Sequence, residues 1–163
     1  MEQLRELRRP DDSLRRAARE LAEQHQLAGT PGRGRAIHRH LERLDREFAT
    51  VYRRLQSDPE AVEGQPRIAE WLLDNDDLIR EALRLLATGL PPEYYRRLPR
   101  LAEAADPDFP RLSDLVRVAV RESRLQVDPD QLQHFISCYQ ELKFLTIGEL
   151  WAVPAMLRLE VLD

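Results

Sequence analysis

The sequence predicts an all-α protein, an antiparallel helical bundle of about six or seven helices in a single domain covering residues 1–163. Apolar residues recur every three or four positions along most of the chain, which is the period of one helix face. No segment alternates β-branched and polar residues as a half-buried strand does. Only 6 glycines interrupt the 163 residues, so the chain has few backbone breaks.

The first four helices are placed by caps, apolar faces and Gly/Pro breaks. Residues 11–13 offer caps for a first helix, with Leu14, Ala18, Leu21 and His25 along one face, and a loop at 29–32 ends it. A second helix is predicted over 34–56, with a narrow heptad-like apolar seam. The seam consists of Ile37, Leu41, Leu44, Phe48, Val51 and Leu55. A third helix is expected over 67–88, and a short fourth near 92–98.

Three further helices follow a proline-rich loop. The fifth is expected over 112–125. Asp128 followed by Pro129 predicts the start of the sixth, because proline suits the first helical position. Thr146 and Glu149 match a capping box that starts the seventh.

The last predicted helix, residues 147–162, is apolar nearly all round. Such a helix is a central core element or contacts a partner. We therefore expect the helices at 34–56, 67–88 and 147–162 to occupy the centre, with Trp71 and Trp151 both largely buried.

Composition excludes several functional classes. Charged residues make up 33% of the chain, its net charge is -4 and its mean hydropathy is -0.55, as in a water-soluble protein. A net negative charge argues against general nucleic-acid binding, and the basic stretch from Arg5 to Arg19 is interleaved with acidic residues, as on a solvated helix face. No run approaches the roughly 18 apolar residues of a membrane span. The helical pattern still continues at Leu162, so we expect a fragment of a longer multidomain protein.

Four carboxylates crowd the third predicted helix, namely Glu70, Asp74, Asp76 and Asp77. Paired carboxylates can catalyse acid–base chemistry or bind a metal. Asp74 and Asp77 fall between the apolar positions, however, so a solvated face is favoured. Asn75 lies within the apolar stripe, and a bond from its amide to backbone groups is favoured over contact with a ligand.

The remaining chemistry-bearing residues do not converge in the sequence. The adjacent Tyr94 and Tyr95, followed by two arginines, could stack on a sugar, although such a pair more often lies half in the core. The histidines are His25, His38, His40 and His134. His38 and His40 point apart on a helix, and no histidine is placed by spacing beside Cys138. We expect no catalytic residue, no metal and no cofactor.

Three stretches, residues 70–75, 90–99 and 145–158, together resemble the N-terminal part of bacterial cyclic β-1,2-glucan synthases. The likeness covers the chain from about Arg9 onward, and the last stretch is the most specific. The first stretch departs from the family pattern, because Asp77 stands where a histidine is common.

The resemblance implies that the chain belongs to a large inner-membrane enzyme that polymerises glucose from UDP-glucose. This segment would lie on the cytoplasmic side and lacks counterparts of the catalytic residues. The resemblance also implies that the segment is a non-catalytic scaffold. Its expected partners are the other domains of the synthase, and glucan is a second candidate partner. Structural or interaction roles are expected for Trp71, Asn75, Tyr94, Tyr95, Thr146, Glu149 and Trp151. The alternative is a free-standing helical adaptor that docks a partner through an apolar helix face.

Overall fold

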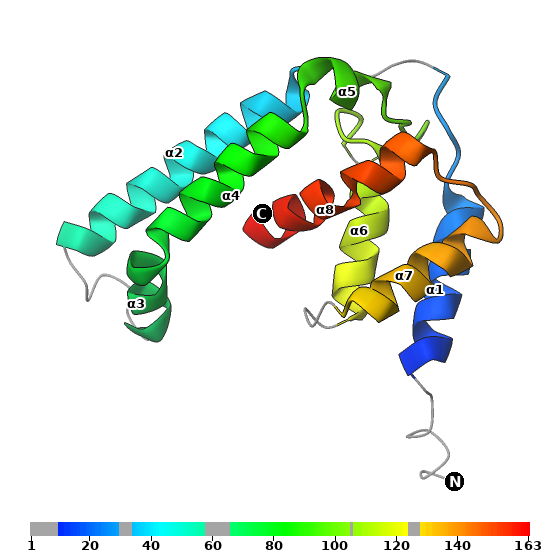
Figure 1. Ribbon diagram of the computed structural model, residues 1–163, viewed down its shortest axis with the longest axis horizontal. Coiled ribbons are helices and arrows are strands. Elements are labelled where there is room, and N and C mark those ends of the chain that lie inside the picture. Colours follow the sequence, from blue (N-terminus) through cyan, green and yellow to red (C-terminus); the bar gives the residue numbers. More distant parts are fainter. Residues whose placement is uncertain (1–9, 30–33, 58–65, 105, 124–127) are drawn as a thin grey trace, which may run out of the picture.

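The computed structural model describes residues 10–29, 34–57, 66–104, 106–123 and 128–163, and these residues form eight helices (Figure 1). The helices are α1 (Pro10–Gln24), α2 (Ala36–Ser57), α3 (Pro66–Asp74), α4 (Asp76–Gly89), α5 (Pro92–Arg97), α6 (Arg111–Glu122), α7 (Pro129–Gln140) and α8 (Ile147–Leu162). The described segments contain no strand, only an isolated antiparallel bridge between Leu27 and Leu101. The all-α prediction is confirmed.

The helices form two groups joined by α8 (Figure 1). On one side α1 packs against α7 and α6, and α6 packs against α8. On the other side α2 and α4 lie antiparallel, and α4 also contacts α8. The last helix is therefore central, as predicted. The expectation that α2 is also central is wrong, because its main neighbours are α3, α4 and α5 on one side of the molecule.

The predicted helix over 67–88 is interrupted at Asn75, which explains the additional helix. Asn75 has φ -113° and ψ 17°, away from helical values. Its side-chain Nδ2 donates to the Trp71 carbonyl at 2.7 Å, the carbonyl that also accepts from the Asn75 backbone N–H at 3.0 Å. Because this amide competes for a helical acceptor, the backbone bends between α3 and α4.

Local helix signals placed the later boundaries well. Asp128 accepts from the Asp130 backbone N–H at 3.1 Å, so the predicted N-cap of α7 is confirmed. The capping box of Thr146 and Glu149 is present at α8. The first helix begins at Pro10, before the expected caps, and residues 124 and 125 of the expected fifth helix lie outside the described residues.

One continuous hydrophobic cluster joins both groups of helices. Its largest fully buried side chains include Tyr95, Tyr139 and Phe135. The two tryptophans are not part of it, because Trp71 is 54% exposed and Trp151 is 80% exposed. The predicted burial of both is wrong: α3 and α8 are each covered on one side only, and each tryptophan lies on the uncovered side.

Candidate functional site

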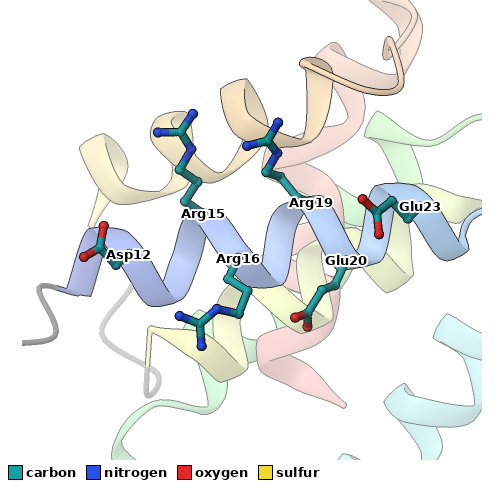
Figure 2. A pocket seen from close by; sticks show the side chains of 6 residues that line it. All are labelled: Asp12, Arg15, Arg16, Arg19, Glu20 and Glu23. Atoms are coloured by element: carbon teal, nitrogen blue, oxygen red, sulfur yellow. The ribbon is translucent and has the colours of Figure 1, made fainter. Parts of the chain in front are cut away.

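The charged side chains of α1 line an open, solvent-exposed face of the helix rather than an enclosed site. Figure 2 shows its six side chains, Asp12, Arg15, Arg16, Arg19, Glu20 and Glu23. Arg15 and Arg19 point toward the neighbouring helix, whereas Arg16 and Glu20 point to the other side of α1 (Figure 2). Arg15 and Arg19 each place Nη2 3.6 Å from a carboxylate oxygen of Glu141. Exposed pairs of this kind contribute at most about 1 kcal/mol, so they orient α1 weakly.

The most strongly organised polar group in the described structure joins α6 to α8. Arg111, the first residue of α6, donates from Nε to Glu149 Oε1 at 2.6 Å and from Nη2 to Oε2 at 2.9 Å. Thr146 donates to the same Oε2 from its backbone N–H at 2.8 Å and from Oγ1 at 2.9 Å. Both charged side chains are buried. The carboxylate therefore has its donors supplied from two helices.

The Arg111–Glu149 pair also fixes the chain that enters α8. Arg111 Nη2 donates to the Phe144 carbonyl at 2.7 Å. Burial opposes the charged form of Arg111, but the hydrogen bond and charge of Glu149 outweigh it, so the pKa of Arg111 is raised. The sequence identified Glu149 as a capping residue and missed its arginine, because Arg111 lies 38 positions earlier.

A second polar group, centred on the buried His25, connects the end of α1 to α6 and α7. His25 Nδ1 lies 2.8 Å from Tyr139 Oη, and its Nε2 lies 3.1 Å from Asp114 Oδ2. The bond from His25 lowers the pKa of Asp114, and burial raises the pKa of Tyr139. The Arg111 guanidinium carbon lies 6.0 Å from the centroid of the Tyr139 ring, which places the two polar groups side by side.

Sequence reasoning treated His25 as isolated, although a usable signal was present. His25 continues the apolar face of Leu14, Ala18 and Leu21, all of which are buried, and is itself buried. A histidine on a buried face requires polar partners. Those partners come from helices distant in sequence, so only the fold could identify them.

The two adjacent tyrosines serve different parts of the fold. Tyr95 is fully buried, donates to the Asp108 carbonyl at 3.1 Å and has the Arg100 guanidinium 5.2 Å from its ring centroid. Tyr94 is half-buried and donates to the Gly148 carbonyl in the first turn of α8. Burial raises the pKa of both hydroxyls. Tyr94 thus joins Thr146 and Glu149 at the start of α8, while Tyr95 anchors α5 in the core.

The carboxylates of α3 and α4 spread over an exposed face. Glu70, Asp74 and Asp77 are exposed, while Asp76 is paired with Arg80 at 2.7 Å. Within the described ranges, no three His, Cys, Asp or Glu side chains approach one another closely enough to hold a metal ion.

Cys138 has a histidine neighbour, although the sequence spacing led us to expect none. Its Sγ lies 3.6 Å from His134 Nε2, one turn earlier on α7, so the expectation of no histidine partner is wrong. The thiol is buried in the hydrophobic cluster.

Within the residues that the structure describes, two groups contain most of the exposed large apolar side chains. The first, here called the α8 outer surface, consists of Phe144, Ile147, Leu150, Trp151 and Val161. The second, the α3–α4 surface, consists of Ile68, Trp71, Leu78 and Leu85. Trp151 and Trp71, predicted as core, are the largest members of these surfaces. Clusters of large exposed apolar side chains are typical of binding surfaces.

No protein-family model matches the chain. Over 156 residues, which are 93% of the chain, the sequence is 34% identical to the cyclic beta-(1,2)-glucan synthase NdvB of Rhizobium meliloti (strain 1021). The chain is related to one segment of a cyclic β-(1,2)-glucan synthase. It spans 5% of the length of that relative. The resemblance to cyclic glucan synthases drawn from the three sequence stretches is thereby confirmed.

None of the helices in the described segments has both the length and the apolar character needed to cross a bilayer.

Proposed function

We propose that this chain is a non-catalytic helical scaffold domain of a cyclic β-1,2-glucan synthase-like glucosyltransferase that uses UDP-glucose in osmoregulated periplasmic glucan synthesis. The observation that carries the proposal is the 34% identity to such a synthase over 93% of the chain. In this proposal the chain is one part of a longer polypeptide and lies on the cytoplasmic side of the inner membrane.

The internal structure suits a scaffold. The Arg111–Glu149 pair holds α6 to α8, and the His25 group holds α1 to α6 and α7. Buried polar side chains such as Glu149, Arg111 and His25 require defined partners and so favour one packing arrangement. Other parts of the synthase are the main partners that we propose for this scaffold.

Glucan is a second candidate partner. Trp71 is half exposed beside the exposed carboxylates Glu70 and Asp74, and aromatic rings next to hydrogen-bonding groups bind sugar faces. Titration of the chain with linear β-1,2-glucan, followed by tryptophan fluorescence in wild type and in Trp71→Ala, measures this contact directly. A response in wild type that is lost in Trp71→Ala supports it, and no response contradicts it.

The scaffold proposal is tested in a full-length synthase that contains this segment. Deletion of the segment, with the rest of the synthase present in membranes at equal amount, should reduce cyclic glucan formed from UDP-glucose. The chain alone should release no UDP from UDP-glucose. Turnover by the isolated chain, or an unchanged yield and length of glucan after deletion, would contradict the proposal.

A free-standing adaptor is the alternative function, and the exposed α8 outer surface favours it equally. The two proposals differ in the size of the native polypeptide. An antibody raised against this chain should detect a much larger protein in cell extracts if the scaffold proposal holds. Detection only of a protein the size of this 163-residue chain would instead support the adaptor.

A further inference from the structure

The two exposed apolar surfaces have opposite electrostatic character. The segment from Leu142 to Arg158, which carries most of the α8 outer surface, contains three charged residues. Glu149 is buried against Arg111, so the charges that reach solvent are the cations Lys143 and Arg158. Farther along the chain, Glu160 pairs with Arg117 of α6, and Asp163 contacts His40 of α2. No carboxylate in this described part of the chain therefore neutralises Lys143 or Arg158.

The α3–α4 surface is flanked by carboxylates. The acidic residues of α3 and α4 outnumber the basic ones. The acidic residues are Glu70, Asp74, Asp76, Asp77 and Glu81, and the basic residues are Arg67, Arg80 and Arg84. Arg80 and Arg84 are engaged with Asp76 and Glu81. The exposed carboxylates of Glu70, Asp74 and Asp77 form no ion pair within the described residues, and Glu70 and Asp77 are the immediate sequence neighbours of Trp71 and Leu78.

We propose that the chain self-associates, with the α8 outer surface of one copy packed on the α3–α4 surface of another. Each surface presents a tryptophan, a residue type enriched among the side chains that dominate binding energy. Lys143 and Arg158 of one copy would face Asp74 and Asp77 of the other. Charge complementarity fixes partner and register, whereas the apolar side chains supply most of the affinity.

A second copy is the occupant best supported, because both complementary halves are present on the same chain. Around a two-fold axis the contact forms twice, once from each copy, which gives a closed dimer. This association goes beyond the proposed scaffold function, and neither depends on the other.

The test is sedimentation equilibrium of the whole chain from about 1 to 100 µM, a range that brackets ordinary transient interfaces. Wild type should associate. Lys143→Glu with Arg158→Glu, and separately Asp74→Arg with Asp77→Arg, should each be monomeric because like charges then face each other. An equimolar mixture of these two variants should associate, and so should a chain carrying all four substitutions. Trp151→Ala should weaken wild-type association at least about tenfold.

A matched control keeps the result interpretable. Arg16→Glu with Arg121→Glu changes the net charge by the same amount as Lys143→Glu with Arg158→Glu, but at exposed positions outside both surfaces. This control variant should associate as wild type does. Thermal unfolding verifies that every variant is folded. The proposal is overturned if wild type is monomeric at 100 µM, if either reversed variant associates like wild type, or if their mixture stays monomeric. None of these outcomes alters the relation to glucan synthases.

Discussion

The two sides of α8 reverse the usual relation between residue type and burial. On the inner side the carboxylate of Glu149 is completely buried, and on the outer side, two residues later, Trp151 is 80% exposed. The inner side lies against α6 and α4, whereas no described residue covers the outer side. Burial in this protein follows from where a neighbouring helix lies and whether it supplies partners. Polarity alone would have given the opposite result.

The energies on the two sides differ for the same reason. Glu149 is stable in the interior only because Arg111 and Thr146 supply its hydrogen bonds. Trp151 is exposed in the folded chain much as it is in the unfolded chain, so it contributes little to folding. The free energy of its burial is available for binding. Substitutions on the two sides should separate stability from association.

The largest effect is expected from Glu149→Ala. Loss of the carboxylate leaves the buried Arg111 unpaired and removes half of the capping box, which should cost about 3–5 kcal/mol in the free energy of unfolding. Urea denaturation followed by circular dichroism measures the change. Exposed Glu70→Ala is the control and should change stability by less than about 0.5 kcal/mol.

Replacing both members of the pair shows whether the stability lost in Glu149→Ala arises from the buried Arg111 that is left without a carboxylate. Arg111→Met combined with Glu149→Leu removes both charges and should recover much of the stability lost in Glu149→Ala. A double variant as unstable as the single variant would mean that the pair contributes a favourable interaction of its own.

A smaller effect is expected from Thr146→Ala. The substitution removes the hydroxyl that caps α8 and donates to Glu149, and should cost about 1 kcal/mol. Thr50, whose exposed hydroxyl donates to the Arg46 carbonyl within α2, is the matched control, and Thr50→Ala should have almost no effect. Equal losses at both positions would show that the cap adds nothing.

Asp114 should make the contact between His25 and α6 modestly sensitive to acid. Its hydrogen bond from His25 lowers its pKa in the folded chain, so its contribution to stability is present above its ordinary pKa of about 3.9. That contribution is lost as pH falls through the lower folded-state pKa. Because the side chain is 40% exposed, the contribution should be below about 1 kcal/mol. The stability difference between wild type and Asp114→Asn should shrink below pH 4, and a constant difference would contradict the assignment.

The smallest effect on folding is expected at Trp151. Trp151→Ala should change the free energy of unfolding by less than about 0.5 kcal/mol, since the side chain has few neighbours to lose. Denaturation at a concentration where the chain is monomeric provides the measurement. A loss of 2 kcal/mol or more would show that Trp151 belongs to the folded core.

Local chemistry explains which predictions succeeded. The caps of α7 and α8 depend on residues within three positions of each other, so they could be recognised directly. The break at Asn75 was missed because periodicity continues across it, although its amide was expected to bond backbone groups and does so on Trp71. The partner of Glu149 and those of His25 are far away in sequence, and no periodic pattern encodes such pairs.

By itself the sequence determined the all-helical class, most helix positions and the relation to cyclic glucan synthases, because these depend on short-range patterns and motif order. The tertiary structure alone decided which side of each helix is covered. Helix periodicity shows that Trp71 and Trp151 lie on apolar stripes, but burial requires a second element against the stripe. Only the packing of α6 against α8 shows that the covered position belongs to Glu149 and the open one to Trp151.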